Sequence, residues 1–498
     1  MDPFYLELTI VLILATLFGL VANLLSQPTI LGFILAGVLV GPLGFFDIAS
    51  PEILDVLAKL GITFLLFIVG LELSVKELKN VGRAALIIGI GQIVATGIIG
   101  FLLALLFSFP LLTSLYIGLA LTFSSTIMVI KLISDKKDLN SLYGKVSVGI
   151  LLIQDVAVII ILILLSGLKG TPGEIGISLV NSLLLVLLKG VILFAIITYL
   201  SKKVFPRLVN LIARSPELLF LVSVSWALGV AVLVASPWVG FSIEIGGLLA
   251  GLALANSSEH FQIGSKIKPL RDLFITLFFL VLGMKMAIIE ITAVFFPALI
   301  FSLFVIVGNP LIVLILMGLL GYKKRTSFFT GLAIAQISEF SFILVALGGE
   351  LGHISSSVVG MITLVGIITF TISSYLILYN NKLYTLFEPF LGIFERKSIS
   401  TKGDKFAVFK NHIVLVGVNR MGTKIMNTLT RQTDKLVVVD FNPDIIKKLT
   451  EGNVTTIFGD ISDPEVLEKA NVKKAKLIIS TVTDLDDNLV LIAESKRA

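Results

Sequence analysis

Apolar segments long enough to cross a membrane recur along the first 380 residues, separated by short polar loops. At 1.5 Å rise per residue, about 20 apolar residues span a hydrocarbon core of roughly 30 Å. The pattern therefore predicts about thirteen transmembrane helices, at residues 5–24, 28–45, 52–73, 84–108, 112–133, 143–167, 176–200, 216–235, 239–256, 270–289, 293–320, 328–348 and 355–380.

The loops between these segments alternate in charge. Every second loop is acidic or nearly neutral, with Asp47, Glu52 and Asp55 in one and Glu350 in another. Because cytoplasmic loops carry an excess of Lys and Arg, we expect the N-terminus outside the cell membrane and the C-terminus in the cytoplasm. The basic loops lie around residues 76–83, 136–145, 202–214, 266–271 and 323–325.

One acidic residue lies in the middle of an apolar segment. Asp155 follows Gln154 within the segment from Tyr143 to Gly167, about 18 Å from either end. A carboxylate near the bilayer midplane is costly and marks a functional site by default, although a structural Asp that pairs with a buried cation is the plainer alternative. We expect Asp155 to bind a monovalent cation or a proton, with Gln154 beside it.

A cluster of hydroxyl groups interrupts the preceding segment. Thr122, Ser124, Ser125 and Thr126 offer oxygen ligands where a helix opens, although such side chains often only bond the carbonyl one turn back. Seven segments later, residues 335–341 interrupt another apolar run at mid-depth. With an odd offset the two copies would be inverted, which predicts inverted repeats and two crossed broken helices, unless the similarity is chance.

Other polar residues in the apolar segments allow more than one interpretation. Glu339 is a second mid-membrane carboxylate, either a ligand or a hydrogen-bonding partner. Lys189 could pair with a carboxylate but more simply reaches the interface. Glu244 is expected to be a charge at a helix start, and Asn309 with Pro310 to mark a kink. The remaining cases need no special role: Glu72, Lys285 and the glycines Gly246, Gly247 and Gly251, which predict close helix packing.

The C-terminal part of the chain has a different composition. The last 98 residues hold 28 of the 72 charged residues. We therefore expect a membrane domain at 1–385, a polar linker at 386–408 and a soluble domain at 409–498. In this last part, short β-branched runs alternate with helical stretches, at 412–416, 436–439, 454–458 and 477–480, which predicts an α/β Rossmann-like fold.

The first strand and helix of this soluble domain carry a dinucleotide-binding fingerprint. Gly417 and Gly422 lie in the turn, and Asp440 ends the second strand, where an acid can meet ribose hydroxyls. Asn419 replaces the middle glycine and occupies space where a pyrophosphate would approach, so a fold without a nucleotide stays an alternative. The full expected set is Gly417, Asn419, Arg420, Met421, Gly422, Asp440, Asp460 and Thr481. The chain ends too early for a six-stranded sheet, so we expect it to be a piece of a longer protein.

Composition excludes several classes of function. The chain has no cysteine, which excludes disulfides and thiol catalysis, and its net charge of +6 comes largely from the basic loops rather than from a nucleic-acid-binding surface. A membrane oxidoreductase would need a haem, flavin or cysteine site in the apolar segments, and none is recognisable. We expect no enzyme activity.

The order of these motifs resembles a known family. Gln27-Pro28, Gly70-Leu71-Glu72, Ser124-Ser125-Thr126, Gln154-Asp155 and Ser338-Glu339-Phe340-Ser341 are similar to the Kef-type members of the second monovalent cation/proton antiporter family. Residues 409–498 resemble the N-terminal half of RCK (TrkA-N) regulatory domains. The resemblance implies a homodimer in which each protomer has a dimerisation domain and a core domain with two crossed broken helices. It also implies that Asp155 is the ion-binding residue and that Gln154 separates this chain from two-acid sodium antiporters. Family members often have a basic residue near the position of Asn309, so gating by a salt bridge through that helix is in doubt.

These expectations combine into one mechanism. A buried carboxyl holds either a proton or a cation, because desolvation disfavours an ionised and empty state. Asp155, with oxygens from Thr122, Ser124, Ser125 and Glu339, would exchange one K⁺, or Na⁺, for one H⁺ without net charge movement. A nucleotide (AMP, ATP or NAD(H)) on the soluble domain would regulate this exchange. The alternatives are a nucleotide-gated cation channel, which the missing filter-like glycine and carbonyl repeat speaks against, and a Na⁺/H⁺ antiporter.

Overall fold

The structure is a computed structural model of the whole chain. It describes residues 3–41, 51–72, 82–136, 141–166, 216–255, 260–285, 288–394 and 409–496, with short gaps at 237, 419, 434, 441–442, 453, 460, 462–463 and 483–484, and a few residues between these ranges. The chain divides into two compact units. One comprises Met1–Leu132, Ser147–Ile312 and Gly331–Tyr379, and the other Ile133–Val146, Val313–Thr330 and Asn380–Ala498.

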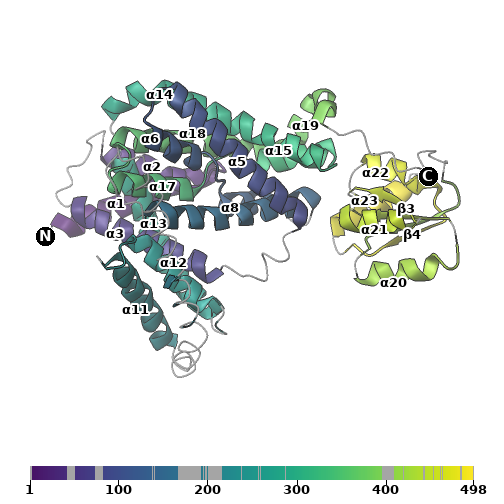
Figure 1. The fold of residues 1–498 in the computed structure, drawn as a ribbon, viewed down its shortest axis with the longest axis horizontal. Helices are drawn as coiled ribbons and strands as arrows, with labels where there is room; N and C mark the ends of the chain where they lie inside the picture. Colours follow the sequence, from purple (N-terminus) through teal and green to yellow (C-terminus); the bar gives the residue numbers. More distant parts are fainter. Residues whose placement is uncertain are drawn as a thin grey trace. The chain divides into compact units, whose positions relative to one another are not determined.

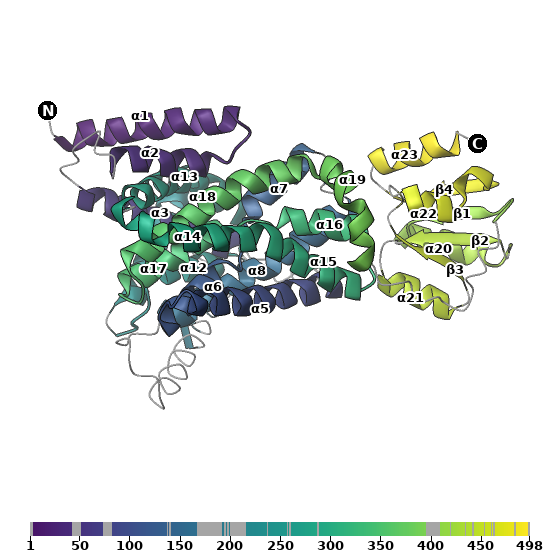
Figure 2. The same ribbon diagram turned by 90° about the horizontal axis from the view of Figure 1, so that it is seen from above.

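In the first unit, six helices pack against one another and form what we call the first helix group (Figures 1 and 2). Close packing depends on small residues, because a Cβ atom at Gly251 would lie 2.0 Å from the Phe67 carbonyl oxygen of the neighbouring helix. The predicted packing role of the glycines near residue 250 is therefore confirmed. The group consists of α1 (Pro3–Leu24), α2 (Thr29–Val40), α3 (Pro51–Glu72), α11 (Pro216–Ala235), α12 (Ile243–Leu254) and α13 (His260–Met284).

Other helices of the same unit form the second helix group. In it α5 packs on α6, α6 on α17, and α18 on both α14 and α17. A π-helical turn, Phe304–Gly308, follows α14 directly and precedes Asn309. The bounds are α5 (Arg83–Leu106), α6 (Leu111–Ala120), α14 (Ile288–Leu303), α17 (Glu339–Glu350) and α18 (Ser356–Leu378).

Two of the predicted segments are interrupted as the sequence indicates. The first is divided into α6 and α7 (Thr126–Asp135), and the second into α16 (Lys324–Ala333) and α17. The two breaks therefore cover residues 121–125 and 334–338. The uninterrupted segment that carries Asp155 is α8 (Leu142–Ser166).

Of the described helices, seven are long and apolar enough to cross a membrane, and α2, α6 and α12 are shorter apolar helices. Residues 176–200, which include Lys189, lie almost entirely outside the described part of the chain. The expected number of thirteen spans therefore stays a prediction, whereas a mostly helical membrane protein is confirmed.

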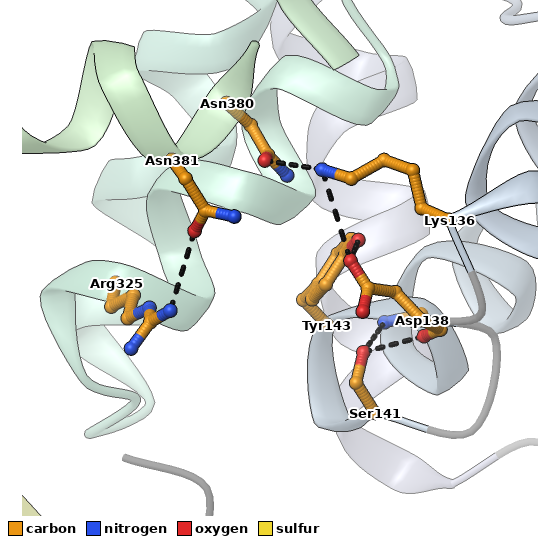
Figure 3. A network of polar contacts seen from close by, with 8 residues as sticks. Lys136, Asp138, Ser141, Tyr143, Arg325, Asn380 and Asn381 are labelled. Atoms are coloured by element: carbon orange, nitrogen blue, oxygen red, sulfur yellow. Dashed lines mark hydrogen bonds and ion pairs between the residues drawn. The ribbon is translucent and has the colours of Figure 1, made fainter. Parts of the chain in front are cut away.

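In the second unit, α19 (Asn380–Leu391) is fixed by polar contacts to two other segments (Figure 3). The Asn380 side chain accepts a hydrogen bond from Lys136, whose ammonium also lies 3.8 Å from an Asp138 carboxylate oxygen. Burial lowers the pKa of Lys136, and the Asp138 carboxylate opposes this shift. Arg325, at the start of α16, donates to Asn381 at 3.3 Å.

The soluble part of this unit is a four-stranded parallel sheet in the order β3-β2-β1-β4 (Figure 2). Its strands are β1 (Ile413–Val416), β2 (Leu436–Asp440), β3 (Thr455–Phe458) and β4 (Leu477–Ser480). Alternation along the strands divides their apolar side chains between two cores. Residues of α22 (Pro464–Lys469) and α23 (Leu485–Ser495) complete one core, and residues of α20 (Arg420–Leu429) and α21 (Pro443–Glu451) the other. All four predicted strands are confirmed.

Candidate functional site

Asp155 lies partly buried on α8 and is held by the N-terminus of α7. The Thr126 hydroxyl lies 3.1 Å from Asp155 Oδ1 and 3.0 Å from Oδ2, so it can donate to either carboxylate oxygen. Thr126 is also the first residue of α7, where the helix dipole favours negative charge. The first break therefore places both a hydroxyl and a positive helix end at this carboxyl group.

Glu339 is the matching acid of the second break and begins α17. Its Oε1 accepts a hydrogen bond of 2.9 Å from the Ser125 hydroxyl, and its side chain is 8% exposed. Ser125 and Thr126 are adjacent in the chain, so neighbouring residues of one break contact the two mid-membrane acids. The hydrogen bond from Ser125 gives the Glu339 carboxyl group a partner, and it is compatible with Glu339 as an ion ligand and as a structural residue.

Serine side chains join the two breaks reciprocally. Ser124 of the first break donates to the Ile334 carbonyl at 2.9 Å, and Ser341 of α17 donates to the Ala120 carbonyl at 2.6 Å. Ser338 caps the N-terminus of α17. Backbone groups that open inside a membrane must find partners within the protein, and these serines supply them.

A chain of amides and hydroxyls holds the other side of the first break. The Gln154 side chain accepts a hydrogen bond from the Ser124 backbone N–H at 2.9 Å and donates one to the side-chain oxygen Oε1 of Gln92 at 2.7 Å. Gln92 donates to Thr96 at 3.1 Å and to the Thr122 carbonyl at 3.1 Å. Gln154 is therefore fixed at both ends of its amide, and it orients the loop next to Asp155.

Asn309 completes this chain from the far side. Its side-chain oxygen accepts a hydrogen bond of 2.9 Å from the Thr96 hydroxyl, and its side-chain nitrogen donates one of 3.4 Å to the Leu121 carbonyl. Interpreting Asn309 as a kink alone was therefore wrong: a helix distortion is present just before it, but its side chain also satisfies a carbonyl of the first break. Instead of a basic residue, this position holds a neutral amide, which bonds the backbone of the first break.

The other polar residues fall mostly where the sequence places them. The Thr122 hydroxyl donates to the Gly118 carbonyl one turn back at 2.8 Å, the plain alternative for such a residue. Glu244 is buried in the first turn of α12. Glu72 and Lys285 form ion pairs at helix ends, with Lys268 at 2.7 Å and with Asp55 at 2.6 Å.

Four residues of this hydrogen-bonded network have no role in the site predicted from the sequence: Thr126, Gln92, Thr96 and Asn309. Thr126 belongs to the recognised hydroxyl cluster but was not assigned to Asp155. Gln92 and Thr96 are four residues apart in an apolar segment and so lie on one helix face. This spacing is a signal that could have found them.

In the soluble domain, the glycine turn has the geometry that the fingerprint needs. Gly417 has φ +82°, and a Cβ at Gly422 would lie 2.1 Å from the Gly417 carbonyl oxygen. Asp440 accepts from the Val418 N–H at 2.6 Å, and Thr481 donates to the Gly417 carbonyl at 2.8 Å. Met421 is exposed at the start of α20.

These residues come together at the carboxyl ends of β1, β2 and β4, where doubly wound folds bind nucleotides. Asn419, Asp460 and the Arg420 side chain lie outside the described residues.

Taken together, a buried acid at two interrupted apolar helices and a parallel-sheet domain define a multi-pass membrane transporter with a soluble nucleotide-binding-type domain. Residues 10–378 match the family described as "Sodium/hydrogen exchanger, transmembrane", and residues 413–498 match the TrkA-N domain. The chain belongs to the sodium/hydrogen exchanger family and carries a TrkA-N domain.

Several named proteins are similar over most of this length. YbaL from Escherichia coli (strain K12), which carries the name of a cation/proton antiporter, is 29% identical over 95% of this chain and 85% of its own length. K(+) efflux antiporter 5 of Arabidopsis thaliana is 32% identical over 69% of this chain, which spans 61% of that protein. The solved sodium proton antiporter MjNhaP1 from Methanocaldococcus jannaschii has the same fold, with a TM-score of 0.56 at 17% identity, over 78% of this chain and 97% of that one.

Proposed function

We propose that this protein exchanges a monovalent cation, K⁺ in preference to Na⁺, for H⁺ across the cell membrane by alternating access. One observation carries the proposal: Asp155 sits in the middle of a spanning helix, where a helix N-terminus and the Thr126 hydroxyl can stabilise it when ionised. A cation or a proton can then occupy the same carboxyl group in turn, and this competition couples the two fluxes.

The surrounding oxygens would complete the cation site. Ser125 bonds Glu339, and Thr122, Ser124 and carbonyls of the two breaks would supply further oxygens, while Gln154 bonds the Ser124 backbone without adding charge. With Glu339 bonded to Ser125 and outside the exchange, one proton would balance one cation and turnover would be electroneutral. Preference for K⁺ is supported by the name of K(+) efflux antiporter 5, which is similar over 69% of this chain.

The larger organisation is proposed on the same grounds. Residues 1–385 would form the transport domain, 386–408 a linker and 409–498 a cytoplasmic regulatory domain, with the N-terminus outside. The reciprocal serine contacts between the breaks support inverted repeats. The first helix group would mediate a homodimer, and a nucleotide in the turn at Gly417–Gly422 would favour one conformation and so change the transport rate.

The test is proton flux in proteoliposomes that contain the purified protein. A K⁺ gradient should drive H⁺ movement that an imposed membrane potential does not change, and Asp155→Asn should abolish it. Glu72→Gln, which neutralises an acid at a helix end that pairs with Lys268 and lies outside the site, serves as the control and should retain coupled exchange. K⁺, Na⁺ and Rb⁺ should be compared with and without AMP, ATP and NADH. Exchange that survives in Asp155→Asn would rule out this site.

The second candidate function is a nucleotide-gated cation channel, which the TrkA-N domain alone would also suit. It predicts salt flux down its gradient with no countermovement of protons. The same liposomes therefore decide between the two functions.

A further inference from the structure

A cavity of about 280 Å³ lies between the two helix groups. On one side it is lined by α3 and α13 of the first group, including Lys59 and Val281. On the other side it is lined by α17 and α18 of the second group, including Glu350 and Val359. By the charge pattern of the loops, this is the end of the helices that faces the outside.

A narrower inner cavity continues from it. The two share three lining residues, Ile62, Ala346 and Glu350, so the shared wall forms a constriction. The inner cavity reaches Ile343, one turn along α17 from Glu339, and Leu162, about two turns along α8 from Asp155. The inner cavity therefore extends from the larger one towards the acids and ends before either of them.

An ion pair lies beside this constriction, since Glu350 lines both cavities and Lys59 lines the larger one. Lys59 Nζ of α3 lies 3.0 Å from Glu350 Oε1 of α17, and it joins the first helix group to the second. A second pair in the same cavity, Lys285 with Asp55 at 2.6 Å, joins α13 to α3 within the first group. The two pairs therefore differ in what they would restrain if the helix groups move against each other.

We infer that the Lys59–Glu350 ion pair is the latch of the outer access path to Asp155. The inference rests on the proposed function: when the second group moves to open or close this path, the pair must break, whereas Lys285–Asp55 stays intact. Glu244 is buried in the wall of the inner cavity, which Glu350 also lines.

Reversible crosslinking of the full chain tests this directly, because the natural sequence has no cysteine. The variant Lys59→Cys/Glu350→Cys is bridged with a short bifunctional thiol reagent that a reductant cleaves. Bridging should stop K⁺/H⁺ exchange, and reductant should restore it. The matched control, Asp55→Cys/Lys285→Cys, should exchange ions equally well when bridged and unbridged.

Charge reversal provides a second measurement. Lys59→Glu should change the exchange rate about two- to fivefold, the range that a partly exposed ion pair supports, and Lys59→Glu/Glu350→Lys should return it to the parent value. If the unbridged cysteine variant is inactive, rescue by the swapped pair tests the latch in its place.

The outcomes separate the two proposals. Continued exchange in the bridged variant, failure of the two positions to crosslink, or no rescue by the swapped pair would each overturn the latch while leaving the exchange function in place. Absence of exchange in the parent chain would overturn the proposed function and the latch with it.

Discussion

Ser125 and Thr126 are neighbours in the chain, yet each contacts a different acid. Ser125 donates to Glu339 of the second break, and Thr126 lies against both oxygens of Asp155. The two hydroxyls therefore have separable effects, because of the two only Thr126 bonds Asp155.

Replacing Thr126 with Val should weaken apparent cation affinity by about tenfold or more, because a hydrogen bond to a charged group is worth ~1.5–3 kcal/mol. The reason is that the ionised carboxylate, which binds the cation, loses a donor that the protonated form needs less. The measurement is the K⁺ concentration for half-maximal exchange. Thr126→Ser keeps the hydroxyl and should stay near the parent value; equal losses in both variants would argue against this role.

At the scale of single residues, the role of a side chain can be predicted from the sequence when it has one plausible partner. Asp155 stood out because a carboxyl in an apolar segment demands a partner or a function. Gln92 does not stand out in the sequence, because an amide in an apolar helix can bond within its own helix as well as to a neighbouring helix. Asn309 was judged by the proline that follows it, whereas its partner, the Leu121 carbonyl, is 188 residues away.

Among the elements, the two broken helices depend on each other. Ser124 bonds the Ile334 carbonyl of the second break, and Ser341 bonds the Ala120 carbonyl at the end of α6, so each interruption supplies a partner for backbone groups at the other. Polar residues within an apolar run predicted where the breaks fall. They did not predict which carbonyl each hydroxyl serves, because that depends on how distant segments pack.

In the second unit, α19 links the chain before the linker to segments that continue into both broken helices. Asn380 contacts Lys136, directly after α7, and Tyr384 packs 5.9 Å from Phe329 of α16. Arg325 lies over both aromatic rings, at 5.3 Å from Phe329 and 5.9 Å from Tyr384. Under the proposed regulation, α19 would be the element through which the soluble domain acts on α7 and α16.

Replacing Asn380 with Ala should remove most of the nucleotide effect on exchange while basal exchange continues. The physical reason is that the buried Asn380 side chain accepts from a half-buried ammonium, and its loss frees α19 from the segment after α7. The measurement is proton flux with and without the nucleotide found to act. Asn381→Ala, which removes only an exposed contact with Arg325, should behave like the parent. A full nucleotide response in Asn380→Ala would contradict the coupling.

For the whole molecule, the orientation in the membrane determines which end of the helices faces the outside and which faces the cytoplasm. The basic loops predict the orientation, and the latch proposal depends on it, since Glu350 lies on the end expected to face outward. Charge bias is a statistical property of whole loops, so it can be predicted from the sequence without knowing how the helices pack.

Single cysteines in the cysteine-free chain test this orientation. Ser355 is exposed between α17 and α18, and Lys435 is exposed before β2 of the soluble domain. In intact cells, a membrane-impermeant maleimide should label Ser355→Cys and leave Lys435→Cys unlabelled, and both should react after the cells are opened. The reverse pattern would place the soluble domain outside and move the Lys59–Glu350 constriction to the cytoplasmic end. The direction of proton flow through the latch would then have to be reassigned, even if Asp155 still binds both ions.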